Sequence, residues 1–119
     1  MSKADQFMYE IDLFKIIDAL RASKIYLYKV KEHMGNWKKD NIRKALFEAV
    51  DDKIIMGLKI FTNRDIFHSV RTALSAQENS PSPEEIAEIL GKWETIRRID
   101  LYIDFIYSKV SKETKQIKV

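Results

Sequence analysis

Arg64 and His68 are the only two residues in the sequence whose types and spacing together suggest catalysis. They lie four positions apart in a predicted helix, so their side chains would project from one helix face. An imidazole can transfer protons near neutral pH, and a guanidinium can stabilise the charge that develops on a phosphate during cleavage. The pair could therefore cleave RNA. The simpler interpretation, which we favour, is an arginine in a helix's first turn and a half-buried histidine, so no catalytic residue is predicted.

The stretch Arg64-Asp-Ile-Phe-His68 resembles the Arg-x₄₋₆-His motif of HEPN ribonucleases, which are helical bundles that dimerise to assemble their active site. The resemblance implies that Arg64 and His68 would act on an RNA substrate in a homodimer. It covers five residues, and the sequence has three intervening residues where the motif has at least four. A ribonuclease is therefore the third hypothesis, behind two binding functions.

A basic stretch between Lys24 and Lys44 is the best candidate for a binding site. It carries seven Lys and Arg residues and only two acids, although the net charge of the whole chain is only +3. Several of its cations lie at a predicted helix start, where backbone N–H groups and cationic side chains together suit phosphate. Aromatic residues among them could stack on unpaired bases. The predicted nucleic-acid-binding residues are Lys31, Trp37, Lys38, Lys39, Arg43 and Lys44.

The predicted C-terminal helix is apolar on more than one side, because aromatic residues lie beside its isoleucine stripe. A helix that buries a single face needs only one apolar side. The second side could therefore bind another protein or a second copy of the chain, and a two-fold dimer is the commonest closed form. Alternatively, this helix is central and the other helices surround it. The predicted interface residues are Trp93, Tyr102, Phe105 and Ile106.

The composition is that of a folded protein. The chain forms one predicted helical domain, residues 1–119, with residues 111–119 expected to fray. Its apolar share of 45% and charged share of 33% exclude a disordered chain. Without cysteine, and without histidines at ligand spacing, no metal or cofactor is predicted. No apolar run approaches the roughly 20 residues of a membrane span, and no signal-peptide pattern opens the chain, so a cytoplasmic location is expected.

The first half of the chain predicts helices, with one ambiguity. Apolar residues spaced three and four apart predict a continuous helix over residues 6–34, which Gly35 ends. In residues 36–61 the apolar residues keep a helical period, but the last part also alternates as in a strand. Because no Gly, Pro or Asn separates the two parts, one long helix capped by Asn36 or Asp40 is favoured.

Two helix starts in the second half complete the predicted fold. Thr62 and Asp65 form a capping box before a short helix, and Ser82 with Pro83 starts a last helix expected to run to about Val110. The prediction is all-α: an antiparallel four-helix bundle with a short third helix. The alternative is a winged helix-turn-helix with a long C-terminal dimerisation helix.

These features favour a non-enzymatic binding protein. Its favoured partner is nucleic acid, DNA or RNA, or a nucleoprotein complex, bound through the basic residues between positions 24 and 44. The alternative is a protein-interaction module, such as a small inhibitor, immunity or adaptor protein, which would use the aromatic C-terminal helix. The salt dependence of binding separates the two hypotheses, because phosphate contacts release counterions and apolar contacts do not.

Overall fold

The computed structural model describes residues 3–32, 35–51, 61–75 and 81–117, and the elements in these ranges are α-helices. They are α1 (Lys3–Lys29), α2 (Lys39–Asp51), α4 (Asn63–Ser75), α5 (Pro83–Leu90) and α6 (Lys92–Ile117). The predicted all-α class is confirmed for these residues. Residues 52–60, which either continue a long helix or form the strand of a wing, lie outside the described residues, so both alternatives stay open.

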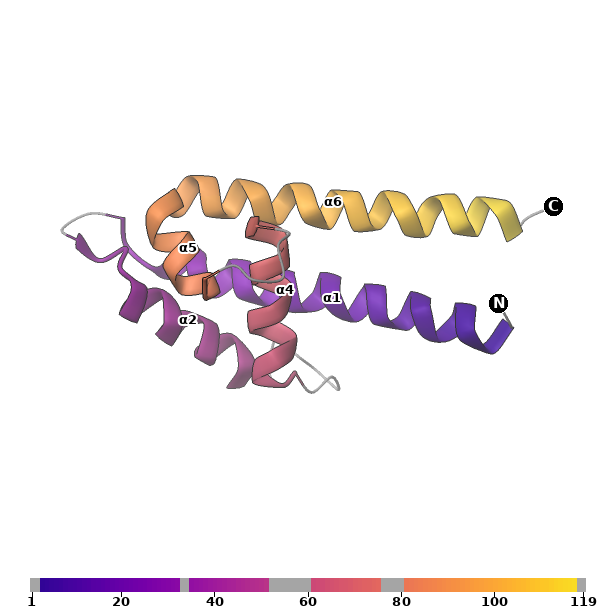
Figure 1. The fold of residues 1–119 in the computed structure, drawn as a ribbon, viewed down its shortest axis with the longest axis horizontal. Helices are drawn as coiled ribbons and strands as arrows, with labels where there is room; N and C mark the ends of the chain where they lie inside the picture. Colours follow the sequence, from indigo (N-terminus) through magenta and orange to yellow (C-terminus); the bar gives the residue numbers. More distant parts are fainter. Residues whose placement is uncertain (1–2, 33–34, 52–60, 76–80, 118–119) are drawn as a thin grey trace.

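Two long helices, α1 and α6, run antiparallel along the molecule, and the three shorter helices gather at one end of them (Figure 1). α1 packs against α2, α4 and α6, and α5 packs against α2, α4 and α6. The two chain ends lie together at the opposite end, which gives an elongated body of 55 × 27 × 23 Å. The short helices therefore cover the C-terminal half of α1.

α1 is continuous, as its periodicity predicts, but it ends at Lys29 rather than near residue 34. The reason lies on α6. The ammonium of Lys92 donates hydrogen bonds to the backbone carbonyls of Tyr28 and Val30, at 2.7 and 2.6 Å. A longer α1 would pair the Tyr28 carbonyl within its own backbone. A cation from a distant part of the chain thus caps α1.

α2 begins at Lys39, three residues after Asn36 and one residue before Asp40, the two residues predicted to cap it. Asp40 lies inside the first turn, and the N–H of Ile42 donates to the carbonyl of Lys38 at 2.9 Å. Lys38 therefore occupies the residue position before the helix. The prediction that Asn36 or Asp40 caps α2 is wrong, and an acid in the first turn still complements the helix dipole.

The capping box before α4 is confirmed. The N–H of Thr62 donates to the Asp65 carboxylate at 2.8 Å, and the N–H of Asp65 donates to the Thr62 hydroxyl at 3.1 Å. The Lys15 ammonium on α1 lies 3.3 Å from the same carboxylate. Partial burial would raise the pKa of Asp65, but the Thr62 hydrogen bonds and Lys15 together outweigh it and lower that pKa.

The last helix is not continuous, because it breaks at Gly91 into α5 and α6. α5 begins at Pro83 after Ser82, as predicted, although the Ser82 side chain makes no capping hydrogen bond. Gly91 has φ 86° and ψ 163°, a conformation essentially restricted to glycine. The turn changes the phase of the apolar residues, and Ile89 on α5 is 82% exposed although it shares the spacing of the core isoleucines on α6.

Of the helices among the described residues, α2 and α4 are amphipathic, with apolar residues on the side that faces the core. None of the described helices is long and apolar enough to cross a membrane. The same part of the chain holds no group of three or more His, Asp or Glu side chains that could bind a metal ion.

Candidate nucleic-acid interface

The four cations predicted to contact phosphate lie together at the start of α2, and all four are exposed. Lys38 precedes the helix and Lys39 begins it, while Arg43 and Lys44 follow one turn later. The guanidinium of Arg43 lies 5.6 Å from the ring centroid of Phe47, which orients it along the helix surface. The first turn of a helix also presents N–H groups that suit anions, although in α2 the N–H of Lys39 already donates to a carboxylate of the chain.

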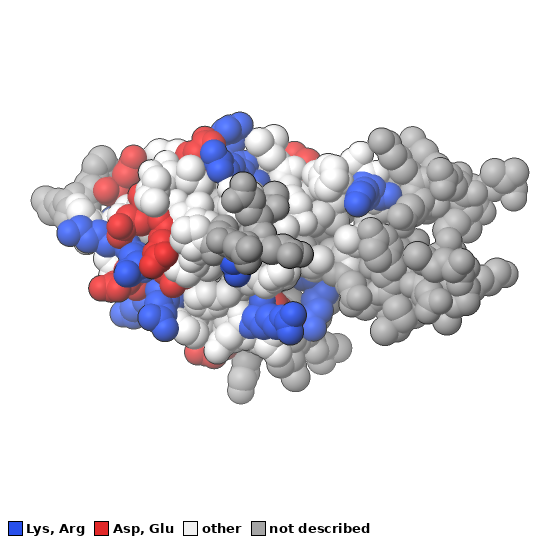
Figure 2. Space-filling view, viewed as in Figure 1, with Lys and Arg blue, Asp and Glu red and all other residues white. Residues whose placement is uncertain are grey.

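Lys39 differs from the other three cations, because α5 supplies acids to it. Its ammonium lies 3.9 Å from the Glu85 carboxylate, and its backbone N–H donates to the carboxylate of Glu88. Figure 2 accordingly shows basic and acidic side chains intermixed over the end of the molecule that carries α2 and α5. Lys39 therefore contributes less positive potential to the surface than its exposure suggests.

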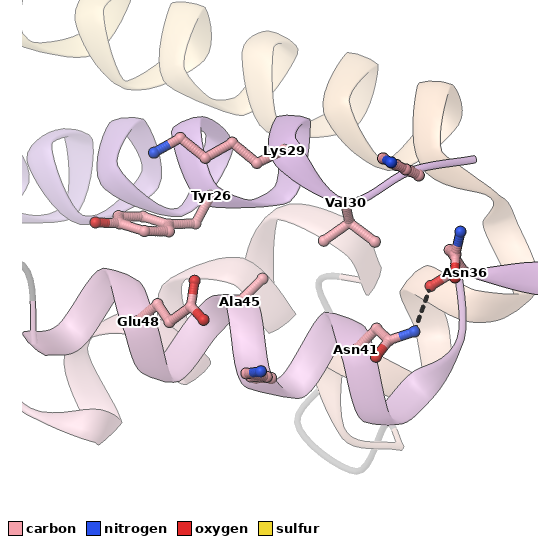
Figure 3. A pocket seen from close by; sticks show the side chains of 9 residues that line it. Tyr26, Lys29, Val30, Asn36, Asn41, Ala45 and Glu48 are labelled. Atoms are coloured by element: carbon pink, nitrogen blue, oxygen red, sulfur yellow. Dashed lines mark hydrogen bonds between the residues drawn. The ribbon is translucent and has the colours of Figure 1, made fainter. Parts of the chain in front are cut away.

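A groove of about 370 Å³ lies between the C-terminal end of α1 and α2 (Figure 3). At one end of it, the side-chain amide of Asn41 donates to the backbone carbonyl of Asn36 at 2.8 Å. The lining combines an aromatic ring, amides, lysines and a carboxylate. The lining residues are Tyr26, Lys29, Val30, Lys31, Asn36, Asn41, Lys44, Ala45 and Glu48.

The groups in this groove match those that recognise unpaired nucleotides. Tyr26 extends from α1 toward α2, where Glu48 lies opposite it, and the Lys29 ammonium is 4.7 Å from the Tyr26 ring centroid. Aromatic faces stack on bases, amides and carboxylates bond to base edges, and lysines neutralise phosphates. We name these groove residues together with Lys38 and Arg43 the α1–α2 surface.

Sequence reasoning found only part of this surface. It named Lys31 and Lys44, which line the groove, but not Lys29, Asn41 or Glu48. The missed residues carry no motif and lie on two helices that meet only in the folded chain. The excess of cations between residues 24 and 44 is the one sequence signal that points to the region.

Trp37 does not belong to the α1–α2 surface, although it was predicted to stack on a base. It is 9% exposed, and its indole N–H donates to the backbone carbonyl of Ala87 at 2.8 Å. A ring packed into the core offers no face to a nucleotide. Trp37 instead attaches the segment before α2 to α5.

A second group of cations, in the first two turns of α6, serves the fold. Lys92 caps α1, and Arg98 donates to the carbonyl of Leu74 at 2.8 Å, near the end of α4. Arg97 and Arg98 also hydrogen-bond the carboxylate of Glu94, at 2.8 and 3.0 Å. The hydrogen bonds from Arg97 and then Arg98 lower the pKa of Glu94 to about 2. These contacts engage the α6 cations within the chain.

The four residues predicted to form a protein interface do not share one surface. Trp93 and Phe105 are 52% and 55% exposed, and Tyr102 is half-buried beside Phe105, with ring centroids 6.2 Å apart. Ile106 is 2% exposed and belongs to the core. A partner could therefore contact the first three but not Ile106. The protein partner and the homodimer stay predictions.

The residues considered for catalysis both lie on the solvent side of α4. Arg64 is exposed in the first turn, as expected, and His68 is exposed rather than half-buried. Neither residue lines the groove between α1 and α2. The structure therefore places them apart from the α1–α2 surface.

Comparisons with known proteins bear on what this surface does. Residues 5–103 match the sequence model of a family described as the anticodon binding domain. The chain is 32% identical to glutamate–tRNA ligase 2 of Thermoanaerobacter pseudethanolicus over 92 residues, which are 77% of the chain and 17% of that ligase. It is 37% identical to glutamate–tRNA ligase of Clostridium acetobutylicum over 76 residues, which are 63% of the chain and 14% of that protein. For the Clostridium tetani glutamate–tRNA ligase the values are 29% over 83 residues, 69% of the chain and 16% of the ligase.

No solved structure matches the chain, and the chain spans about a sixth of the length of these relatives. The prediction of a non-enzymatic protein is contradicted, because the relatives are ligases and ligases are enzymes. The matched family also differs from the ribonucleases that the Arg64–His68 stretch resembles.

Proposed function

The chain belongs to the anticodon-binding domain family, and on this premise we propose that it binds tRNA through the α1–α2 surface. An anticodon consists of unpaired nucleotides at the tip of an RNA loop. Proteins recognise such loops by stacking on the bases, by hydrogen bonds to base edges and by cations on the phosphates. The groove and the cations beside it offer all three kinds of contact.

Four cations are assigned to phosphate oxygens: Lys31, Lys38, Arg43 and Lys44. All four are exposed, and two of them line the groove: Lys31, which follows α1, and Lys44 on α2. Phosphates that follow the groove would pass between them. Lys39 is assigned a smaller part, because Glu85 and Glu88 already engage it.

The interior of the groove is assigned to one unpaired base. Tyr26 offers an aromatic ring, while Asn41 and Glu48 offer groups that can bond to a base edge. The volume of about 370 Å³ lies at the lower end of the roughly 300–1,000 Å³ typical of small-ligand sites. A paired duplex keeps its bases stacked inside the helix, so the groove favours looped RNA over duplex DNA.

We further propose that the chain supplies tRNA recognition to a protein of the glutamate–tRNA ligase type. The support is the similarity to three such ligases, which extends over 63–77% of the chain. The observation that carries the proposal is the family match over residues 5–103, since charge alone would equally suit DNA.

The experiment compares two variants with the same change in net charge. One reverses Lys38 and Lys44 (Lys38→Glu with Lys44→Glu), and the matched control reverses Arg64 and Lys109, which are exposed elsewhere. Binding to total bacterial tRNA and to duplex DNA is measured by fluorescence anisotropy at several salt concentrations. If both lysines contact phosphates, the slope of log K against log salt should shrink by about 1.4 to 1.8 in the first variant.

The control variant should keep most of the parent slope, because its charges lie away from the groove. The parent should bind tRNA more tightly than duplex DNA at the same salt concentration. An equal loss of tRNA affinity in both variants would show that the net charge of the chain, and not this surface, drives binding. Absence of tRNA binding by the parent at low salt would refute the proposed function itself.

A further inference from the structure

Two aromatic rings are exposed side by side where α1 ends and α6 begins. Tyr28 lies in the last turn of α1 and is 56% exposed, and Trp93 lies in the first turn of α6 and is 52% exposed. Their ring centroids are 5.7 Å apart, with an interplanar angle of 75°. We name this pair the aromatic platform. Burial of these rings in a complex would remove a large apolar area from water.

The platform is held in place before any partner binds. The ammonium of Lys92 lies 5.1 Å from both ring centroids and donates to the carbonyls of Tyr28 and Val30. The Trp93 indole N–H donates to the carboxylate of Glu32 at 2.6 Å. Side chains that are already oriented lose less conformational entropy when a ligand covers them.

The platform and the groove share one short segment, residues 30–32. Val30 and Lys31 line the groove, while Val30 accepts a hydrogen bond from Lys92 and Glu32 accepts one from Trp93. A flexible ligand that fills the groove can therefore continue past this segment onto the rings. Lys31, an exposed cation that lines the groove, belongs to this segment.

We propose that Tyr28 and Trp93 stack on unpaired bases of an RNA loop that occupies the α1–α2 surface. This inference rests on the proposed function and narrows its ligand to RNA with unstacked bases, rather than duplex regions. Continuity with the groove and the lysines beside it favour RNA over a protein partner, since lysine is depleted at the core of protein interfaces. Base–aromatic stacking tolerates different bases, so the platform contributes affinity more than sequence specificity.

Intrinsic fluorescence gives a direct test on the unmodified chain. Trp93 is 52% exposed and Trp37 is 9% exposed, so a ligand that covers the platform changes mainly the Trp93 emission. Saturating single-stranded RNA of mixed sequence, or total tRNA, should quench the emission. The same measurement on Trp93→Leu, which keeps only Trp37, should lose most of that quenching.

Affinity provides the second readout. Tyr28→Leu and Trp93→Leu remove an aromatic face but keep apolar bulk, and each should weaken binding of tRNA by about 5- to 150-fold. Trp93→Phe restores a ring and should recover most of the affinity. Phe105→Leu is the matched control, because Phe105 is 55% exposed on the same helix but lies away from the platform. A blunt RNA duplex should bind all four variants about as well as it binds the parent.

Three outcomes separate the inference from the proposed function. Unchanged tRNA affinity in Tyr28→Leu and Trp93→Leu, with no quenching in the parent, would overturn the platform even if charge reversal at Lys38 and Lys44 weakens binding. If Trp93→Leu and Trp93→Phe weaken tRNA binding equally, Trp93 has a structural role, and the proposal that it stacks on bases is overturned. Failure of the parent to bind tRNA at all would overturn both proposals.

Discussion

Lys92 provides the most sensitive test of how this fold is held together. Its ammonium is almost buried, since the residue is 8% exposed, and it joins the start of α6 to the carbonyls of Tyr28 and Val30. Lys92→Met removes the charge and keeps an unbranched apolar chain of similar length. The variant therefore isolates the cap on α1 from the packing of the side chain.

The magnitude follows from what the ammonium does. Hydrogen bonds from a charged group contribute about 1.5–3 kcal/mol each, and a cation at a helix C-terminus adds about 0.3–2 kcal/mol. Methionine recovers part of the cost of removing an ammonium from water, which offsets some of the loss. We expect Lys92→Met to lower the free energy of unfolding by about 2–4 kcal/mol. For a chain of 119 residues, this corresponds to a fall in Tm of about 8–16 °C.

The assay is thermal and urea unfolding followed by circular dichroism. The matched control is Lys109→Met on the same helix, because Lys109 is exposed and lies over the Phe105 ring at 5.4 Å. That change should cost less than about 0.5 kcal/mol. If Lys92→Met and Lys109→Met unfold at the same temperature, the carbonyls of α1 do not depend on Lys92 and the reasoning fails.

Three further predictions concern other parts of the fold. Because folding lowers the pKa of Asp65, the stability that its carboxylate contributes is present at a pH above the ordinary pKa of 3.8 and is lost as the pH falls through the pKa in the folded state. Thermal melts between about pH 5 and pH 2 should therefore show a smaller acid-induced fall in Tm for Asp65→Asn than for the parent. Gly91→Ala should lower the free energy of unfolding, measured with urea, by about 1–3 kcal/mol, because the backbone conformation at this position disfavours a side chain. An added Cβ meets no atom within 4 Å, so the cost comes from the backbone alone. An unchanged urea midpoint would contradict this prediction. Phe105→Glu should leave a helical spectrum, whereas Ile106→Glu buries a charge and should cost several kcal/mol, so equal effects would contradict the assigned burial.

Helix starts were readable from the sequence because their determinants are local. Thr62 and Asp65 exchange hydrogen bonds across three residues, so their identities are enough to predict the capping box. Pro83 marks the beginning of α5 for the same reason, since its fixed φ suits the first helical position. The continuous periodicity of α1 likewise follows from the spacing of its own apolar residues.

Helix ends depended on how the helices pack together. α1 stops at Lys29 because Lys92 caps it, and α5 stops at Leu90 because the chain turns at Gly91. A glycine inside a helix costs only about 1 kcal/mol, so tertiary packing decides whether the helix continues or breaks there. The break also changes the phase of the apolar residues that precede it, which explains why Ile89 is exposed although it shares the spacing of the core isoleucines.

The sequence by itself determined that this chain is helical, where several helices start and that cations concentrate between Lys24 and Lys44. Only the tertiary structure decided which cations face solvent and which hold the fold. Lys38 and Lys44 remain exposed, whereas Lys92 and Arg98 bond to carbonyls of other helices. The physical reason is that periodicity and capping arise from neighbours along the chain, while the partner of a long cationic side chain is set by which helices pack together.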